Sequence, residues 1–415
     1  MSTDPNINTV ATTKLPLPLW EFVLMIAGLM ALNALAVDTM IPAMSEIGEF
    51  YQTPNENDQQ MVIFAYIFGF GFPQLIFGPL SDRFGRKGPM QICLICFAIV
   101  GIACMFAKTF YILLALRFMQ GVFAAGFRVM ATSIVRDVTS GRAMASILSL
   151  IFTVFIIVPI IAPSIGTLVL IFADWRWTFG ILGLAGSAML LWTFFRLPPT
   201  LPPEKRQPLN WRNIGESYKT VLTTRIAIGY MFASGIAFGA LFAFIGAAEQ
   251  IFADVFGRGE TIWIWFAVVA SGIGVASLIN SRIVERLGMR RISHTVLILF
   301  IALSVINLIA MWLSGQNFWI FLLLFTLGFA CFGMIGANFS SIALEPLGEI
   351  AGYAAAVYGT ATTTISAIIG FGIARQFDGT VFPILIGFVG MGVISLILVL
   401  ITERGKLFEV GEGKV

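Results

Sequence analysis

Twelve long apolar segments constrain this chain more than any other feature of its 415 residues. A helix needs about 20 apolar residues to cross roughly 30 Å of hydrocarbon, because each residue advances it by about 1.5 Å. Hydrophobic residues make up 58% of the chain and charged residues only 11%, whereas soluble domains carry roughly 25% charged residues. We therefore predict an all-α membrane protein with twelve transmembrane helices. They cover residues 20–42, 61–80, 89–107, 110–135, 143–173, 177–195, 226–251, 261–281, 292–312, 318–344, 350–374 and 380–402.

The lysine and arginine residues predict the orientation of these helices. Basic residues concentrate in the cytoplasmic loops of membrane proteins. With the N-terminus placed in the cytoplasm, nineteen of the 25 basic residues fall in cytoplasmic segments and four fall outside, while Arg117 and Arg128 lie within a helix. An odd number of spans would spoil this alternation. We predict a multi-pass protein of the cell inner membrane with both termini in the cytoplasm.

One long hydrophilic stretch, residues 197–225, divides the predicted helices six and six. It contains the run LPPTLPPEKRQP, whose prolines cannot continue a helix. The domain prediction is therefore an N-terminal six-helix bundle over residues 1–196, a cytoplasmic linker over 197–225 and a C-terminal six-helix bundle over 226–415.

A weak internal repeat favours two pseudo-symmetric bundles. An acid, an arginine, a glycine and a further base recur in the same order in residues 82–87 (DRFGRK) and, 203 residues later, in residues 285–290 (ERLGMR). Both stretches lie between the second and third helix of their half, although short basic loops can also look alike by chance. Duplicated six-helix halves are a known transporter plan, with the substrate site near the membrane midplane where the halves meet.

Two charged residues in the first half are candidates for proton coupling, because charges within a membrane are costly and usually functional. Asp38 lies near the outer end of the first predicted helix, and Arg117 lies seven residues into the fourth. The two residues are at similar depth, so they would pair if these helices are neighbours. Burial favours the neutral acid and a nearby guanidinium favours the carboxylate, which would make a switchable proton site. A fixed structural ion pair is the alternative.

Several further polar residues are candidates for a site within the membrane. Arg128 follows Arg117 by three helical turns and shares its helix face, which is expected to line an aqueous cavity, although Arg128 can also extend to the cytoplasmic surface. Glu249 is a possible second acid, but a solvated end of the seventh helix is the simpler explanation. Four more residues are candidates for a substrate cavity, or else join helices by hydrogen bonds: Asn33, Tyr230, Asn338 and Tyr358.

Other function classes find no support in the sequence. No GxxxxGK[ST] loop occurs, so ATP is not expected to drive the protein directly. We find no cluster of metal ligands and no nucleophile–base pair, and therefore predict neither an enzyme nor a protein with a metal or cofactor. The net charge of +3 gives no argument for a nucleic-acid partner.

The stretch GPLSDRFGRK, residues 78–87, resembles the loop signature of the major facilitator superfamily, Gly-x-Leu-x-Asp-Arg-x-Gly-Arg-Lys. The resemblance implies a charged latch that holds the two halves together in the outward-facing state. Within it, Arg86 would meet Asp137 at the end of the fourth helix, and Asp82 would face the start of the eleventh. Gly78 and Gly85 would permit a close helix approach and a tight turn. The implied latch residues are Gly78, Asp82, Arg83, Gly85, Arg86, Lys87 and Asp137.

Two further motifs indicate which members of the superfamily the chain resembles. LLALRFMQGVFAA, residues 113–125, resembles the helix-four signature of proton-coupled members through Arg117, Gln120 and Gly121, with a phenylalanine at position 123 where a glycine is usual. VPIIAPSIG, residues 158–166, is similar to the antiporter motif of the fifth helix, in which Pro159 and Pro163 predict a kink. Ala-Pro stands there for the usual Gly-Pro, and threonine follows Gly166 in place of a second glycine.

This form of the antiporter motif, together with the stretch VDTMIPAM at residues 37–44, resembles the bicyclomycin/chloramphenicol-resistance (Bcr/CflA) group of drug:proton antiporters. Asp38 then matches the helix-one aspartate of that group. Some multidrug relatives carry a further glutamate about two turns earlier, where this chain has Met30.

The leading functional hypothesis is a proton-coupled exporter of drugs or other small amphipathic organic molecules that works by alternating access. Its expected partners are the substrate, protons and the lipid bilayer, and the chain is expected to be monomeric. A proton symporter that imports a siderophore, sugar or organic acid is the alternative, against which the antiporter motif argues. A membrane sensor would need a large output domain, yet the longest predicted loop has about 29 residues.

Overall fold

The computed structural model describes residues 15, 17–55, 57–139, 141–206 and 209–408. Throughout these residues the regular secondary structure is helical. Among the described residues, ten helices are long and apolar enough to cross a membrane, and the bent pair α3–α4 makes one more span. The twelfth is α7, which runs unbroken for 32 residues. The fold is the predicted one of twelve transmembrane helices.

The spans are α1 (Leu19–Asp38), α3 (Met61–Gly71) with α4 (Gln74–Phe84), α5 (Lys87–Met105), α6 (Phe110–Val138), α7 (Gly141–Phe172), α8 (Arg176–Arg196), α10 (Arg225–Gln250), α11 (Ile262–Leu287), α12 (Met289–Ser314), α13 (Phe318–Leu344), α14 (Ala351–Ala374) and α15 (Phe382–Thr402).

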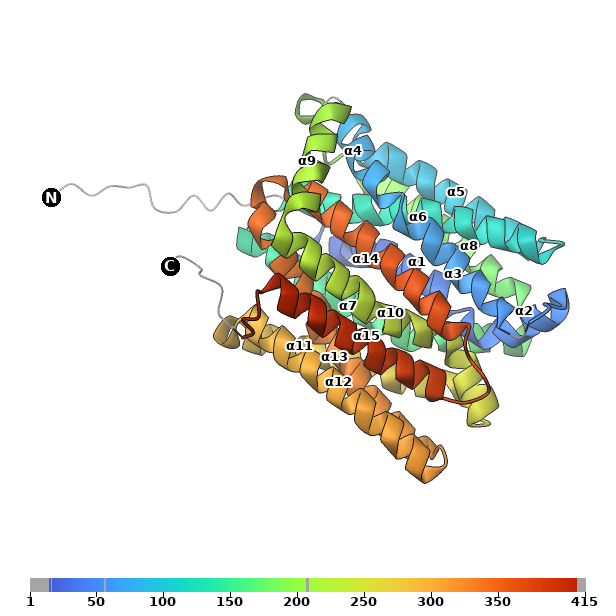
Figure 1. Ribbon diagram of the computed structural model, residues 1–415. Coiled ribbons are helices and arrows are strands. Elements are labelled where there is room, and N and C mark those ends of the chain that lie inside the picture. Colours follow the sequence, from blue (N-terminus) through green and yellow to red (C-terminus); the bar gives the residue numbers. More distant parts are fainter. Residues whose placement is uncertain (1–14, 16, 56, 140, 207–208, 409–415) are drawn as a thin grey trace.

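The long helices lie side by side in two bundles (Figure 1). In the first bundle α6 packs against α3 and α5, and in the second α10 packs against α14, α15 and α13. The bundles meet through α14 with α3 and α4, and through α7 with α11. The short helix α9 (Trp211–Thr223) marks one end of the molecule and α2 (Met44–Tyr51) marks the other. We call these the α9 end and the α2 end.

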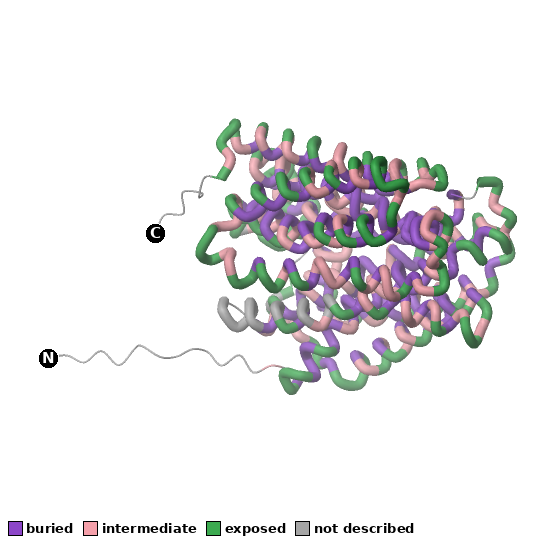
Figure 2. Tube along the Cα trace, turned by 90° about the horizontal axis from the view of Figure 1, so that it is seen from below, coloured by how far each residue is buried: buried purple, intermediate pink, exposed green. Residues whose placement is uncertain are grey.

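Figure 2 shows exposed residues along the outer faces of the helices and buried residues in the interior of the bundle. Many of the exposed residues are large and apolar. Phe172, Trp312 and Leu313 are 82%, 74% and 71% exposed. Continuous apolar surface of this kind would drive a soluble protein to aggregate. Lipid tails are a matching solvent for it, so the exposed faces are the lipid-facing ones.

The second span is broken, which the sequence analysis did not predict. α3 ends at Gly71 and α4 begins at Gln74, with a bend of 45° between them. Pro73 lies at the break. Because proline has no N–H and its ring clashes with the preceding turn, it interrupts the hydrogen-bond ladder of a helix. Both parts of the bent span pack against α14 of the other bundle.

The linker between the bundles contains a helix that the sequence analysis also missed. α9 begins after Asn210, whose side chain accepts hydrogen bonds from the backbone N–H groups of residues 212 and 213, a common way to start a helix. Ile214 and Val221, seven residues apart, are buried on one face. That face packs against α10 and α14, so the linker is fastened to the second bundle.

The two loops of the internal repeat have the same backbone turn. Gly85 ends α4 with φ 86° and ψ 164°, and Gly288 ends α11 with φ 80° and ψ 147°. Glycine alone adopts this region readily, so both glycines are needed by the turn. An ion pair follows each turn: Arg86 with Asp137 in the first bundle and Arg290 with Glu345 in the second.

Candidate functional site

Buried amide side chains join the two bundles at the α2 end. The Gln250 side chain donates to Asn57 Oδ1 at 2.7 Å, and the Gln60 side chain donates to Gln250 Oε1 at 2.6 Å. The Asn57 amide also donates to the backbone carbonyls of Arg375 and Phe377, each at 3.0 Å. These bonds connect segments 190 or more residues apart in the chain, and they close this end of the molecule.

Glu249 belongs to the same junction and is not the solvated helix end favoured by the sequence analysis. It is 9% exposed, and Ser45 Oγ donates to its Oε1 at 2.6 Å across the bundles. Its Oε2 is buried with no hydrogen-bond partner among the described residues. Glu249 is covered because α2 of the first bundle carries Ser45 against it and because α10 continues into a π-helical turn, Ile251–Val255.

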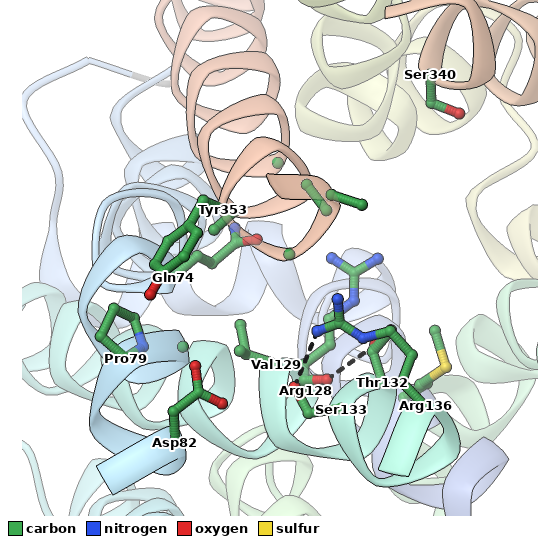
Figure 3. Close-up of a pocket in the computed structure, with 17 residues that line it drawn as sticks. Gln74, Pro79, Asp82, Arg128, Val129, Thr132, Ser133, Arg136, Ser340 and Tyr353 are labelled. Carbon is green, nitrogen blue, oxygen red and sulfur yellow. Dashed lines mark hydrogen bonds between the residues drawn. The ribbon is translucent and has the colours of Figure 1, made fainter. Parts of the chain in front are cut away.

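A cavity of about 520 Å³ lies between the bundles, on the side of the α9 end (Figure 3). This volume suits a drug-sized molecule, since small-molecule pockets commonly measure roughly 300–1,000 Å³. α4 and α6 form the wall from the first bundle, and α13 and α14 form the wall from the second. Its polar lining comprises Gln74, Asp82, Arg128, Thr132, Ser133, Arg136, Ser340 and Tyr353.

Arg117 is completely buried and joins three helices of the first bundle. Its guanidinium donates to the Val62 carbonyl on α3 at 3.2 Å, to the Ala36 carbonyl on α1 at 2.7 Å, and to the Gln120 side chain at 2.6 Å. Its Cζ also lies 4.6 Å from the centre of the Tyr66 ring. A buried charge is tolerated only when its donors are used, and here backbone carbonyls use them.

The expected ion pair between Asp38 and Arg117 is absent from the part of the chain that the structure describes. α1 and α6 are neighbours as the pairing required, but Arg117 binds the carbonyl of Ala36, two residues before Asp38. Asp38 ends α1 and is 5% exposed. Arg117 therefore holds the backbone beside Asp38, and among the described residues the carboxyl group itself has no cationic partner.

Glycine contacts between α3 and α6 place Arg117 within reach of α3. A Cβ atom at Gly121 would lie 2.0 Å from the Tyr66 carbonyl oxygen, and one at Gly69 would lie 2.0 Å from the Phe118 carbonyl oxygen. Both distances are far below van der Waals contact, so the two helix backbones approach as closely as glycine permits. The helix-four motif thus combines a buried arginine with the glycine that lets its partner helix approach.

The antiporter motif lies against the end of α1 that carries Asp38. A Cβ atom at Gly166 would lie 2.1 Å from the Thr39 carbonyl oxygen. Pro159 and Pro163 stand inside α7, which continues as one helix through both. This glycine therefore brings α7 against the residue that follows Asp38.

The latch loop forms the predicted ion pair between Arg86 and Asp137, and Arg86 also pairs with Asp82 in the same bundle. Arg86 binds Asp137 at 2.9 Å and Asp82 at 2.5 Å, and Lys87 donates to the Phe194 carbonyl at 2.9 Å. Although burial opposes the charge of Arg86, its hydrogen bond to Asp137 and the charges of both aspartates raise its pKa. Arg86 is thus fixed as a cation between two acids.

Two details of the latch differ from expectation. No atom of another segment lies within 4 Å of a Cβ built at Gly78, so the predicted close helix approach is missing there and Gly78 lines the cavity instead. Asp82 lines the same cavity as Gly352 and Tyr353 at the start of α14, as predicted, but shares it with them across open space. The cavity accounts for both differences, because it is lined by Gly78 and Asp82 on one side and by the start of α14 on the other.

The sequence model of the Major Facilitator Superfamily matches residues 26–372. This chain belongs to the Major Facilitator Superfamily. Membership makes it a membrane transporter and not an enzyme.

Relatives within the superfamily include drug-resistance proteins. The chain is 30% identical to a bicyclomycin resistance protein homolog of Haemophilus influenzae, over 91% of this chain and 94% of the relative. It is 25% identical to the multidrug resistance protein MdtL of Escherichia coli, over 82% and 85% of the two chains. These matches confirm the resemblance to the bicyclomycin-resistance group.

Solved transporters of the superfamily share the fold. The xylose transporter XylE of Escherichia coli, in a partially occluded inward-open conformation, superposes with a TM-score of 0.72 at 12% identity and covers 91% of this chain and 98% of its own. The human organic anion transporter MFSD10 superposes with a TM-score of 0.64 at 17% identity, over 92% and 99% of the two chains. Likeness at such low identity concerns the fold alone.

The four polar residues named as candidates for a substrate cavity bind neighbouring helices instead. Each makes a side-chain hydrogen bond of 2.7–2.8 Å that joins two helices, and none contributes to the lining of the 520 Å³ cavity. The alternative that they join helices by hydrogen bonds therefore holds in this structure. The pairs are Asn33 with Tyr66, Tyr230 with Glu403, Asn338 with Asn280, and Tyr358 with Ser234.

A hydrogen bond between Tyr218 of the linker helix and the Leu75 carbonyl on α4, near the cavity, was not predicted from the sequence. Pro79 stands inside α4 and has no N–H to give to the carbonyl of Leu75, four residues earlier. The Tyr218 hydroxyl, from the linker helix α9, donates to this carbonyl at 2.7 Å. Burial raises the pKa of Tyr218 to about 12, so its hydroxyl remains a donor at physiological pH. The linker thus satisfies a carbonyl that proline leaves unpaired, and it connects the two bundles.

We expect Tyr218→Phe to lower the free energy of unfolding by about 1–3 kcal/mol, because the substitution leaves the Leu75 carbonyl without a donor. The denaturation midpoint of the purified chain measures this effect. Tyr111→Phe is the matched control, since Tyr111 is 82% exposed. Equal midpoints for the two variants would contradict the assigned role.

Proposed function

We propose that the chain is a proton-coupled exporter of drugs or other small amphipathic organic molecules, working by alternating access. The observation that carries the proposal is the position of Asp38: a buried carboxyl group without an ion-pair partner among the described residues, at the closed end of the molecule. A carboxyl group in such surroundings favours its neutral, protonated form. The names of the drug-resistance relatives support the substrate class.

The predicted orientation gives each end of the molecule a role. The α2 end faces the outside, and the α9 end, with both termini, faces the cytoplasm of a cell whose inner membrane holds the protein. With the α2 end open, outer water protonates Asp38, and the neutral side chain then permits closure of the amide junction around Asn57, Gln60 and Gln250. The cavity at the α9 end next accepts substrate from the cytoplasm, and substrate binding favours release of the proton.

Arg117 is the link between the proton site and the rest of the first bundle. It binds the Ala36 carbonyl beside Asp38 and the Val62 carbonyl near the start of α3. α3 is also the helix that Gln60 precedes, and Gln60 takes part in the junction. A change in the charge of Asp38 would therefore act on a guanidinium that is connected to the closed end through α3.

The latch would stabilise the outward-facing state, in which the α9 end is closed and the α2 end is open. When the α9 end closes, Asp82 would meet the start of α14, across the space that is now the cavity. Arg86 and Asp137 would keep the loop in the required shape. The six helices on each side of the 197–225 linker would move as units, in a protein that we take to be a monomer.

The test is export driven by an imposed proton gradient. In proteoliposomes with an acidic lumen and the cytoplasmic side of the protein facing outward, we expect substrates to accumulate in the lumen several-fold above the medium. An ionophore that dissipates the gradient should abolish this accumulation. Accumulation that persists with the ionophore, or that needs the reverse gradient, would contradict the proposal.

A further inference from the structure

Arg128 is set apart from the other charges of the cavity. It stands on α6, on the face shared by Thr132 and Arg136, and all three line the cavity (Figure 3). Its guanidinium carbon lies 5.3 Å from the centre of the Phe70 ring. Within the described ranges of the chain, the guanidinium has neither an acidic partner nor a hydrogen bond to a side chain.

The remaining charges around the cavity balance one another. Asp82 and Asp137 both bind Arg86. Arg136 lies within the electrostatic reach of these three residues and donates to Ser133 Oγ at 3.2 Å. The two carboxylates of Asp82 and Asp137 thus offset the charges of the two guanidiniums of Arg86 and Arg136. Arg128 adds one positive charge for which the described cavity wall has no counterpart.

An uncompensated guanidinium in a confined site attracts an anion. Its planar donors match the geometry of a carboxylate or a similar oxyanion, which they can bind through two hydrogen bonds at once. The rest of the lining includes apolar side chains, among them Met30, Val129 and Ala356. An occupant that satisfies both features has an apolar body and one anionic group.

We propose that the transported molecules are amphipathic organic anions, and that Arg128 binds their anionic group. This inference rests on the proposed export function and specifies its substrate class. Tyr353, on α14 of the other bundle, lines the same cavity, so an anion held by Arg128 would lie between the two bundles. Binding would then be sensitive to the approach of the bundles.

The test uses three probes with one naphthalene skeleton: naphthalene-1-acetate, its neutral amide naphthalene-1-acetamide, and the cation 2-(1-naphthyl)ethylamine. Binding to the full chain is measured by isothermal titration calorimetry in phosphatidylcholine nanodiscs, which contain no anionic lipid to compete for the site. A charge-assisted hydrogen bond in a confined site is strong. We expect the acetate to bind at least about tenfold more tightly than the amide or the amine.

Arg128→Gln should abolish this preference, and Arg128→Lys should retain part of it because the charge remains. Arg282→Gln is the matched control, since Arg282 is exposed on α11 and does not line the cavity; it should keep the full preference. Equal or tighter binding of the amide or the amine to the unmodified chain would overturn the inference, as would a failure of all three probes to bind. A preference that survives in Arg128→Gln would also overturn it. The comparison on the unmodified chain holds even if a variant does not fold.

Transport assays separate this inference from the proposed function. Preferential binding of the acetate without transport driven by a proton gradient would contradict the exporter and leave the anion site standing. Gradient-driven export confined to neutral or cationic compounds would contradict the anion site and leave the exporter standing.

Discussion

Asp38→Asn is expected to reduce gradient-driven accumulation of substrate to the level of empty liposomes. Asparagine has nearly the shape of the protonated acid but cannot release a proton. A carrier that is permanently neutral at this position can still exchange substrate for substrate, but it cannot use a proton gradient. We therefore expect exchange of labelled for unlabelled substrate to continue while accumulation is lost.

The control for this variant is Asp174→Asn, because Asp174 is an exposed acid paired with Arg176 before α8. It should accumulate substrate as the unmodified chain does. Full accumulation by Asp38→Asn would show that another group carries the proton. Loss of both accumulation and exchange would instead show that Asp38 is needed for the fold or for substrate binding.

Gly121→Ala is expected to cause one of the largest losses of stability that a single added methyl group can cause in the first bundle. The new Cβ would lie 2.0 Å from the Tyr66 carbonyl oxygen, which is backbone and cannot rotate away. Insertion of atoms into a close-packed contact commonly costs about 1–3 kcal/mol or more. We expect a loss of at least about 3 kcal/mol, because separation of α3 from α6 also withdraws the Val62 carbonyl from Arg117.

Gly390→Ala is the matched control, in the interior of α15 and with no atom of another segment within 4 Å of its Cβ position. Alanine is the better helix former by about 1 kcal/mol, so this variant should be as stable as the unmodified chain or more stable. Chemical denaturation of both variants in one detergent gives the comparison. Similar midpoints for the two would refute the close contact between α3 and α6.

The spans were accessible to sequence reasoning because they depend on local composition. The family and the pair between Arg86 and Asp137 were accessible because a motif resemblance implied them. Apolar length determines whether a segment can cross a membrane. The turns at Gly85 and Gly288 each require a glycine at a fixed position. The break at Pro73 was missed because the apolar run continues through it. The helix α9 was missed because it is short and mostly polar, with only Ile214 and Val221 buried, and directly follows a proline-rich stretch.

The candidate site was harder to predict, since its contacts depend on backbone atoms and on the partner bundle. Depth along a helix indicated that Asp38 and Arg117 are near one another. Residue types do not reveal that the guanidinium donates its hydrogen bonds to the backbone carbonyls of Ala36 and Val62. Glu249 resembled a solvated helix end because nothing in its own segment shows that Ser45 covers it. Arg128 lines the cavity, as helix periodicity predicted. Arg117, which was expected on the same cavity-lining face, is instead buried against α1 and α3.

The central claim is that substrate and protons move in opposite directions, and the most direct measurement is proton flux driven by a substrate gradient. Proteoliposomes containing a pH-sensitive dye, with equal pH on both sides, are mixed with an external transported substrate. Exchange predicts that the lumen becomes alkaline as substrate enters and protons leave, and that Asp38→Asn gives no signal. Acidification of the lumen would mean that protons accompany the substrate, and would contradict the account.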